Sequence, residues 1–153
     1  MTMVSDPTPG TPGRPANLLH ALLAAGFAAL VLIVADLLVR LVPFRAIARR
    51  IAVTLRRTAS DASAVRRVEW AVAAARARIP WTIPCLAAAI AANRLLAWRG
   101  IASELWLGVR PRAQMSVDAH AWLIAEGRVV TGGAEKKLYQ PLHAIVTRPA
   151  PPR

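Results

Sequence analysis

The sequence contains a single cysteine and few acidic or aromatic residues. One cysteine cannot form an internal disulfide, and nothing near Met1 resembles a cleaved secretion signal, so a reducing cytoplasm is the expected compartment. Eight Asp and Glu residues stand against twenty Lys and Arg, which gives a formal net charge of +12. Such a balance predicts an acidic partner, an anionic membrane surface or nucleic acid.

Signatures of several ligand classes are also missing. The three histidines and the cysteine have spacings that match no metal signature, so no metal site is expected. Gly132-Gly133 lacks the lysine and the following helix of a phosphate-binding loop. The arginines belong to no recognisable nucleic-acid-binding module. We therefore expect no cofactor and no nucleic-acid partner.

Apolar residues, in contrast, make up 56% of the chain. The run from Leu18 to Val42 predicts a long helix that Pro43 ends. His20, Asp36 and Arg40 interrupt it, whereas a spanning helix needs about twenty apolar residues. A buried or partner-binding helix is the main expectation, with interfacial membrane contact and a true span as alternatives. The next segment, 44–57, has helical apolar spacing and many arginines, which is typical of a solvated face or a membrane-surface helix.

Changes in composition predict the domain organisation. Residues 1–15 are rich in proline and glycine and are expected to form a disordered tail. A hydrophobic and basic helical region is expected over 16–57. A polar break around 58–63, where Ser60 or Asp61 can cap the next helix, leads into a second domain at 62–147.

Cys85 is the first candidate for chemistry. It follows Pro84 at the head of an apolar helical pattern that Gly100 is expected to end. Backbone N–H groups at a helix N-terminus carry partial positive charge and favour a thiolate. His120 lies far along the chain in a strand-like segment, which is the pattern of a cysteine nucleophile and its base. A buried structural cysteine is the alternative.

The second half of the chain predicts a mostly antiparallel sheet. Strand patterns occupy 104–109, 119–125, 128–131 and 139–147. Glu126-Gly127 suits a two-residue hairpin turn, which would place Ala125 opposite Arg128 and His120 opposite Gly133. With the helix from Cys85, these strands predict an α+β fold.

A set of short motifs follows in order along residues 18–142: Pro80-Trp81, Cys85-Leu86, Leu95-Leu96, Arg99-Gly100-Ile101, Leu107-Gly108-Val109, Ala119-His120-Ala121-Trp122, Glu126-Gly127-Arg128-Val129 and Tyr139-Gln140-Pro141-Leu142. This set resembles the lasso peptide biosynthesis B2 proteins, transglutaminase-like cysteine proteases that remove the leader from a lasso peptide precursor. The resemblance implies a papain-like or transglutaminase-like core, with a helix on an antiparallel sheet and N-terminal helices before it.

The same resemblance implies roles for individual residues. Cys85 would be the nucleophile and His120 the general base and acid, with Trp81 beside the nucleophile and Trp122 also in contact with substrate. The family has an aspartate on the strand after the histidine, but residues 132–134 contain no carboxylate. Glu135 is the favoured substitute; Asp118 and Glu126 are alternatives, and a carbonyl or amide is another way to orient the imidazole.

The implied partners are the precursor leader, a leader-binding B1 protein and an ATP-dependent macrocyclase. We expect the substrate to be delivered in trans, with a threonine as the penultimate leader residue. Two other functions stay open: a non-catalytic membrane-associated or scaffolding protein, and a transglutaminase-type acyl transferase.

Overall fold

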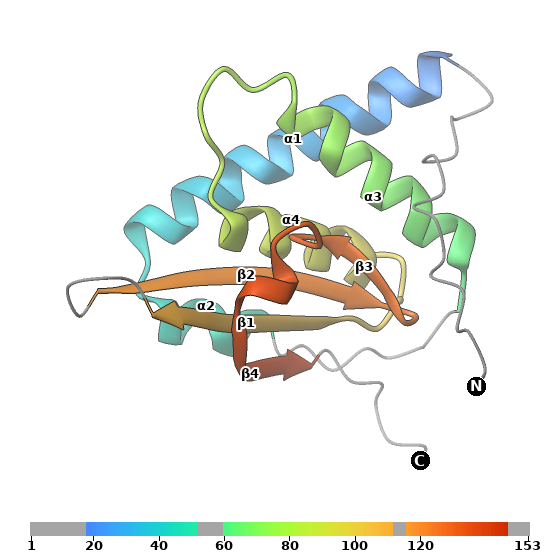
Figure 1. Ribbon diagram of the computed structural model, residues 1–153. Coiled ribbons are helices and arrows are strands. Elements are labelled where there is room, and N and C mark those ends of the chain that lie inside the picture. Colours follow the sequence, from blue (N-terminus) through green and yellow to red (C-terminus); the bar gives the residue numbers. More distant parts are fainter. Residues whose placement is uncertain (1–17, 52–59, 112–115, 147–153) are drawn as a thin grey trace, which may run out of the picture.

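The computed structural model describes residues 18–51, 60–111 and 116–146. The tails predicted at 1–15 and 148–153 lie outside these ranges. The elements follow in the order α1 (Leu18–Leu41), α2 (Phe44–Ile51), α3 (Ala62–Arg76), α4 (Cys85–Ala97), β1 (Glu104–Pro111), β2 (Val117–Ala125), β3 (Arg128–Thr131), η1 (Lys136–Leu138) and β4 (Gln140–Val146). Figure 1 shows α1, α3 and α4 layered on one face of the sheet, with η1 crossing the other face.

The sheet has four strands in the order β3-β2-β1-β4, and its three pairings are antiparallel. Successive side chains of a strand point to opposite faces. Leu105 pairs with Leu123 and Leu107 with Ala121, and these side chains belong to the same hydrophobic core as the helices. The predicted α+β class, with a helix packed on an antiparallel sheet, is confirmed.

α1 ends before Pro43, as predicted, and it packs on both α3 and α4. Its inner face consists mainly of small side chains, which let the helix axes approach closely. The buried residues of this face are Ala21, Ala25, Ala28, Leu32 and Ala35, with Asp36 beside them. α1 therefore contributes to the central core with one face only.

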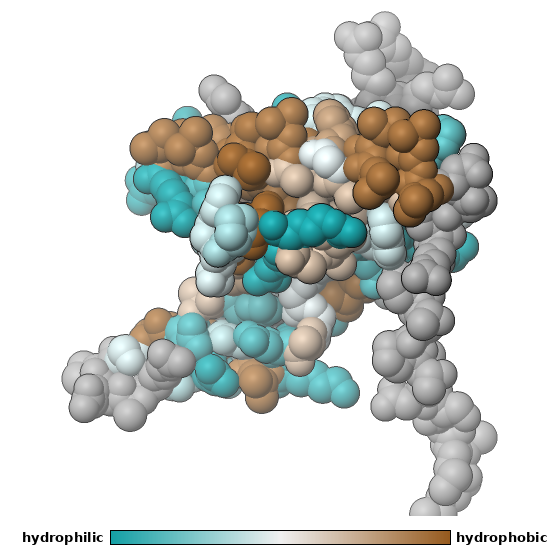
Figure 2. Space-filling view, turned by 90° about the horizontal axis from the view of Figure 1, so that it is seen from above, coloured by the Kyte–Doolittle hydropathy of each residue, from teal (hydrophilic) through white to brown (hydrophobic). Residues whose placement is uncertain are grey.

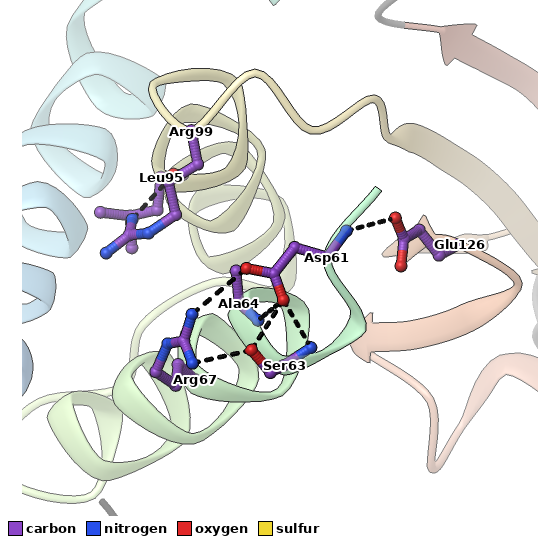
Figure 3. A network of polar contacts seen from close by, with 7 residues as sticks. All are labelled: Asp61, Ser63, Ala64, Arg67, Leu95, Arg99 and Glu126. Atoms are coloured by element: carbon purple, nitrogen blue, oxygen red, sulfur yellow. Dashed lines mark hydrogen bonds and ion pairs between the residues drawn. The ribbon is translucent and has the colours of Figure 1, made fainter. Parts of the chain in front are cut away.

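α3 begins at a side-chain cap. The Asp61 carboxylate accepts hydrogen bonds from the backbone N–H groups of Ser63 and Ala64 at 2.9 and 3.0 Å (Figure 3). The Ser63 hydroxyl also donates to this carboxylate. The hydroxyl bond, the two backbone bonds and the nearby charge of Arg67 together lower the pKa of Asp61. The backbone N–H of Asp61 donates to the Glu126 carboxylate at 2.9 Å. These contacts join the start of α3 to the β2–β3 hairpin.

The hairpin turn is the predicted two-residue type. Glu126 and Gly127 have φ values of 49° and 74°, and Ala125 pairs with Arg128. The register changes one residue further on, because Ile124 pairs with Val129 and Leu123 with Thr131. Val130 is the extra residue of this β-bulge. The predicted pairing of His120 with Gly133 is therefore wrong: the described ladder ends at Thr131.

Candidate active site

Cys85 is the first residue of α4, and Pro84 is its N-cap. The Pro84 side chain provides no cap hydrogen bond. N–H groups of the first helical turn have no partner within the helix, so they are free to interact with an anion beside the thiol. Cys85 is a free, half-buried thiol packed at the border of the core. It is thus both held in place and reachable.

The loop before Cys85 is fixed by three anchors. Ile83 is buried, with 1% of its surface exposed, and its carbonyl accepts a hydrogen bond from Arg76 Nη2 at 3.0 Å. Trp81 donates its indole N–H to Asp36 of α1 at 3.3 Å and leaves 46% of its surface exposed. Trp81 therefore stands four residues before the thiol and leaves nearly half of its surface in contact with solvent.

His120 lies in the middle of β2, and its side chain is buried by the connection between β3 and β4. Its neighbours Ala121 and Leu123 belong to the helix-facing core, so alternation places His120 and Trp122 on the face that this connection covers. His120 Nε2 lies 2.9 Å from the carbonyl oxygen of Gly132. A carbonyl only accepts hydrogen bonds, so Nε2 carries the proton and Nδ1 is the basic nitrogen of the neutral ring.

The backbone at Gly132 admits only glycine. Its φ is +73°, in the region that side chains rarely occupy. A Cβ atom at this position would also lie 2.5 Å from the carbonyl oxygen of Ala121 and 3.0 Å from Trp122 Cα. The chain therefore crosses β2 at close range here, and this crossing brings the Gly132 carbonyl to the imidazole.

Glu135, the favoured acid, lies on the other side of the ring. Its Oε2 atom is 3.9 Å from His120 Nδ1, which is too long for a hydrogen bond. The side chain is 61% exposed. Glu135 can attract a protonated Nδ1, but the hydrogen bond that orients the imidazole is donated by Nε2–H to the Gly132 carbonyl.

The two other candidate acids have different partners. Asp118 accepts hydrogen bonds from Arg110 Nη2 and from the Tyr139 hydroxyl, each at 2.9 Å. The bond with Asp118 is the main cause that raises the pKa of Tyr139, with burial second. Glu126 is engaged at the start of α3. Asp118 thus holds Tyr139, whose ring stacks on the imidazole with 4.9 Å between the two centroids.

Trp122 encloses the imidazole from the strand side, with 6.1 Å between ring centroids. Its indole is 2% exposed and stacks on Trp106. A Cβ at Gly108 would fall 2.8 Å from the Trp122 ring, so the glycine provides the space for it. Contact of Trp122 with substrate stays a prediction, because the ring is covered in this structure.

The structure thus brings His120, Gly132, Glu135, Tyr139 and Trp122 together. Among the described residues, no hydrogen bond joins the Cys85 thiol to His120, and no group of three or more Cys, His, Asp or Glu side chains is arranged to hold a metal ion. The sequence reasoning missed Gly132 and Tyr139 as neighbours of the imidazole. The Gly132-Gly133 pair directly after a strand was the available signal for a close backbone approach.

Comparison with known families gives one result. The family model described as "Transglutaminase-like superfamily" matches residues 29–144, a range that contains α4, β2 and both Cys85 and His120. The searches of curated proteins and of solved structures found no match. The superfamily is typically enzymatic, and membership suggests Cys–His protease or transferase chemistry. Since the match covers well over half of the sequence, this chain belongs to the transglutaminase-like superfamily, which includes the lasso peptide B2 proteins.

Proposed function

We propose that this protein is a cysteine peptidase that removes the leader from a lasso peptide precursor. The observation that carries the proposal is the placement of Cys85, a reachable free thiol at the first residue of α4, within the superfamily match. The ordered motifs of the sequence support the B2 branch of that superfamily.

In the proposed reaction His120 Nδ1 takes the proton from the Cys85 thiol. The thiolate attacks the scissile carbonyl carbon, and the protonated imidazole then gives its proton to the departing amine. A water molecule, deprotonated by Nδ1, hydrolyses the thioester and releases the leader with a new carboxylate. Backbone N–H groups of the first turn of α4 are positioned to stabilise the oxyanion. His120 lies on the sheet face that the β3–β4 connection covers, whereas Cys85 packs at the border of the helix-facing core, so the proposed transfer requires precursor binding to bring the two side chains together.

We propose that two groups, the Gly132 carbonyl and the Glu135 carboxylate, share the role of the third catalytic residue. The Gly132 carbonyl fixes the tautomer and the angle of the imidazole from the Nε2 side. Glu135 supplies a negative charge 3.9 Å from Nδ1. An exposed charge is screened by water, so its contribution is small.

The partners are part of the proposal. We infer that a B1-type leader-binding protein presents the precursor in trans, and that an ATP-dependent macrocyclase then closes the ring. Trp81, with its exposed ring next to the Cys85 loop, is the proposed contact for leader residues near the cleaved bond.

The test is mass spectrometry of a lasso precursor incubated with this protein and its B1 partner. Wild type is expected to cut at one bond, whereas Cys85→Ala and His120→Ala are expected to be inactive. His20→Ala is the matched control, because His20 is exposed on α1 and should not affect cleavage. Equal cleavage by Cys85→Ala and wild type would sink the peptidase proposal and favour a scaffold.

A second product distinguishes acyl transfer from hydrolysis. A transglutaminase-type reaction uses the same thioester but joins it to an amine, so no new free carboxylate forms. The same mass spectra, recorded with an added primary amine, therefore separate the two reactions. Modification of Cys85 by a small alkylating reagent gives an independent readout of thiol reactivity.

A further inference from the structure

We propose that the exposed face of α1 docks on an anionic lipid surface, with the helix lying in the plane of the membrane interface. This interaction is separate from the proposed peptidase activity. It rests on the exposure of α1, on the charge of the helices around it and on an apolar groove beside it.

The exposed residues of α1 between His20 and Arg40 are apolar. Leu19, Leu23, Leu30, Leu37 and Leu41 are each more than half exposed. Figure 2 shows the resulting band of hydrophobic residues along one side of the molecule. The helix has 24 residues, a length of about 36 Å at 1.5 Å per residue. An exposed apolar strip of this extent is typical of a surface that meets a membrane or a partner.

The opposite face of α1 determines how the helix can meet lipid. By length and composition α1 is apolar enough to cross a membrane, yet 28% of its most apolar window is buried. Those buried positions, such as Ala28 and Leu32, are part of the core with α3 and α4. A spanning orientation would expose that core, whereas a helix lying at the interface keeps it intact.

The sequences of α1, α2 and α4 have an excess of positive charge. The sequences of α1, α2 and α4 contain Arg40, Arg45, Arg49, Arg50 and Arg94. Their only acid is Asp36, which is 6% exposed and accepts hydrogen bonds from Arg40 and Trp81. These helices therefore complement anionic headgroups.

An apolar groove of about 430 Å³ opens between α1, α2 and α4. Trp98 lies at it, 57% exposed and with its ring centroid 5.6 Å from that of Phe27. The guanidinium carbon of Arg94 is 5.9 Å from the Trp98 ring. Tryptophan prefers the membrane–water interface, and an arginine beside it can meet a phosphate while acyl chains enter the groove.

Lipid explains this surface better than a protein partner or a second copy. Protein interfaces have a polar rim with hydrogen bonds. From Leu18 to Ala35, however, His20 is the only polar side chain of α1. A long strip with a single hydrogen-bonding side chain, close to its N-terminal end, fits the uniform interior of a lipid layer.

Vesicle flotation of the full-length protein tests the proposal. We expect binding to vesicles of phosphatidylcholine with phosphatidylglycerol, weakened at least ~10-fold on phosphatidylcholine alone or at high salt. The double variant Leu23→Glu/Leu30→Glu should bind at least ~10-fold more weakly, since it places two charges on the apolar face. The matched control is Leu138→Glu/Leu142→Glu, which changes two exposed leucines outside α1 and should float as wild type. Circular dichroism confirms that both variants fold.

Four results would overturn the proposal. The first is no flotation with either vesicle type, and the second is equal flotation of the α1 variant and wild type. The third is retention of the protein in the membrane after alkaline carbonate extraction. The fourth is self-association of a protein that does not bind vesicles, with the self-association lost in the α1 variant. The third would indicate a spanning helix, and the fourth a second copy as the occupant. Quenching of Trp98 by brominated lipid, lost in Trp98→Phe, is the expected positive signal.

Discussion

At the scale of single residues, the chemistry of His120 depends on a backbone carbonyl. A carboxylate in that position would both orient the imidazole and stabilise its protonated form. The Gly132 carbonyl orients the ring and selects the tautomer, but it carries no full charge. The proposed catalytic pair therefore keeps its geometry and loses much of the electrostatic support that a triad acid provides.

Gly132→Ala should lower kcat with the precursor. The added Cβ would meet the Ala121 carbonyl at 2.5 Å in a backbone conformation that already disfavours a side chain, so the loop must move away from His120. Loss of one orienting hydrogen bond corresponds to roughly 1 kcal/mol, or about a five- to tenfold lower kcat. The neighbouring variant Gly133→Ala is the control, because its Cβ meets only the Val129 side chain, at 3.1 Å. Equal rates for the two variants in single-turnover cleavage assays would contradict the role of Gly132.

Glu135→Gln should have a smaller effect. The carboxylate is 61% exposed and 3.9 Å from Nδ1, and exposed pairs of this kind are worth about 0.2–1 kcal/mol. We expect kcat to fall by at most about fivefold, with the loss reduced at high salt because the charge interaction is screened. A loss as large as that of His120→Ala, unchanged by salt, would instead make Glu135 the missing triad acid.

Sequence reasoning located the candidate pair but not its surroundings. Cys85 and His120 follow from residue type and from the helix and strand patterns around them. The contact of Gly132 with the imidazole depends on the bulge at Val130, which shifts the register of β3. The residues of a two-residue turn determine the first pair of the ladder, Ala125 with Arg128. They do not predict a bulge further along the strands.

At the scale of elements, local signals predicted most of the secondary structure. The proline after α1, the cap at Asp61 and Gly100 after α4 are all found at helix ends, and Gly100 has the predicted left-handed conformation, with φ 72°. η1 had no such signal, because three residues of 3₁₀-helix are too few for a periodic pattern. The elements are therefore encoded locally, whereas the cover over His120 arises from tertiary packing.

The cap of α3 should make stability depend on pH on the acid side. Hydrogen bonds from Ser63 and Ala64 lower the pKa of Asp61 in the folded state. A group with a lowered folded pKa stabilises the fold above its unfolded pKa, near 3.8, and this contribution is lost as the pH falls through the folded pKa. Asp61→Ala should thus lower the melting temperature at pH 7, with the difference from wild type shrinking toward pH 3.

Asp61→Asn separates the cap from the charge. Asparagine also accepts the hydrogen bonds of a helix N-terminus but does not titrate. Its melting temperature at pH 7 should lie between those of wild type and Asp61→Ala, with a weaker acid dependence than wild type. Calorimetric scans between pH 3 and pH 7 measure this, and parallel curves for all three proteins would refute the linkage to Asp61.

At the scale of the whole molecule, the N-terminal helices and the sheet share one hydrophobic core. Leu32 of α1, Val68 of α3, Leu96 of α4 and Leu123 of β2 belong to the same cluster of buried side chains. The superfamily match also begins inside α1, at residue 29. The division of the chain into regions 16–57 and 62–147 stays a prediction about composition, and unfolding experiments can test whether it is also a division in stability.

Leu32→Ala should destabilise the entire protein in a single transition. Leu32 has 0% of its surface exposed and lies where α1 meets the common core, so its truncation leaves a cavity that costs about 2–5 kcal/mol. Far-ultraviolet circular dichroism follows the helices, while fluorescence of a background that keeps Trp106 and Trp122 as its only tryptophans follows the sheet. If the protein unfolds as one cooperative unit, both signals of Leu32→Ala move to the same lower melting temperature. The control is Leu30→Ala, at a position 58% exposed on the same helix, and its melting temperature should stay close to that of wild type. Helical signal lost before the fluorescence changes would show that α1 unfolds alone, and the hydrophobic face of the helix would then be anchored on a separable region.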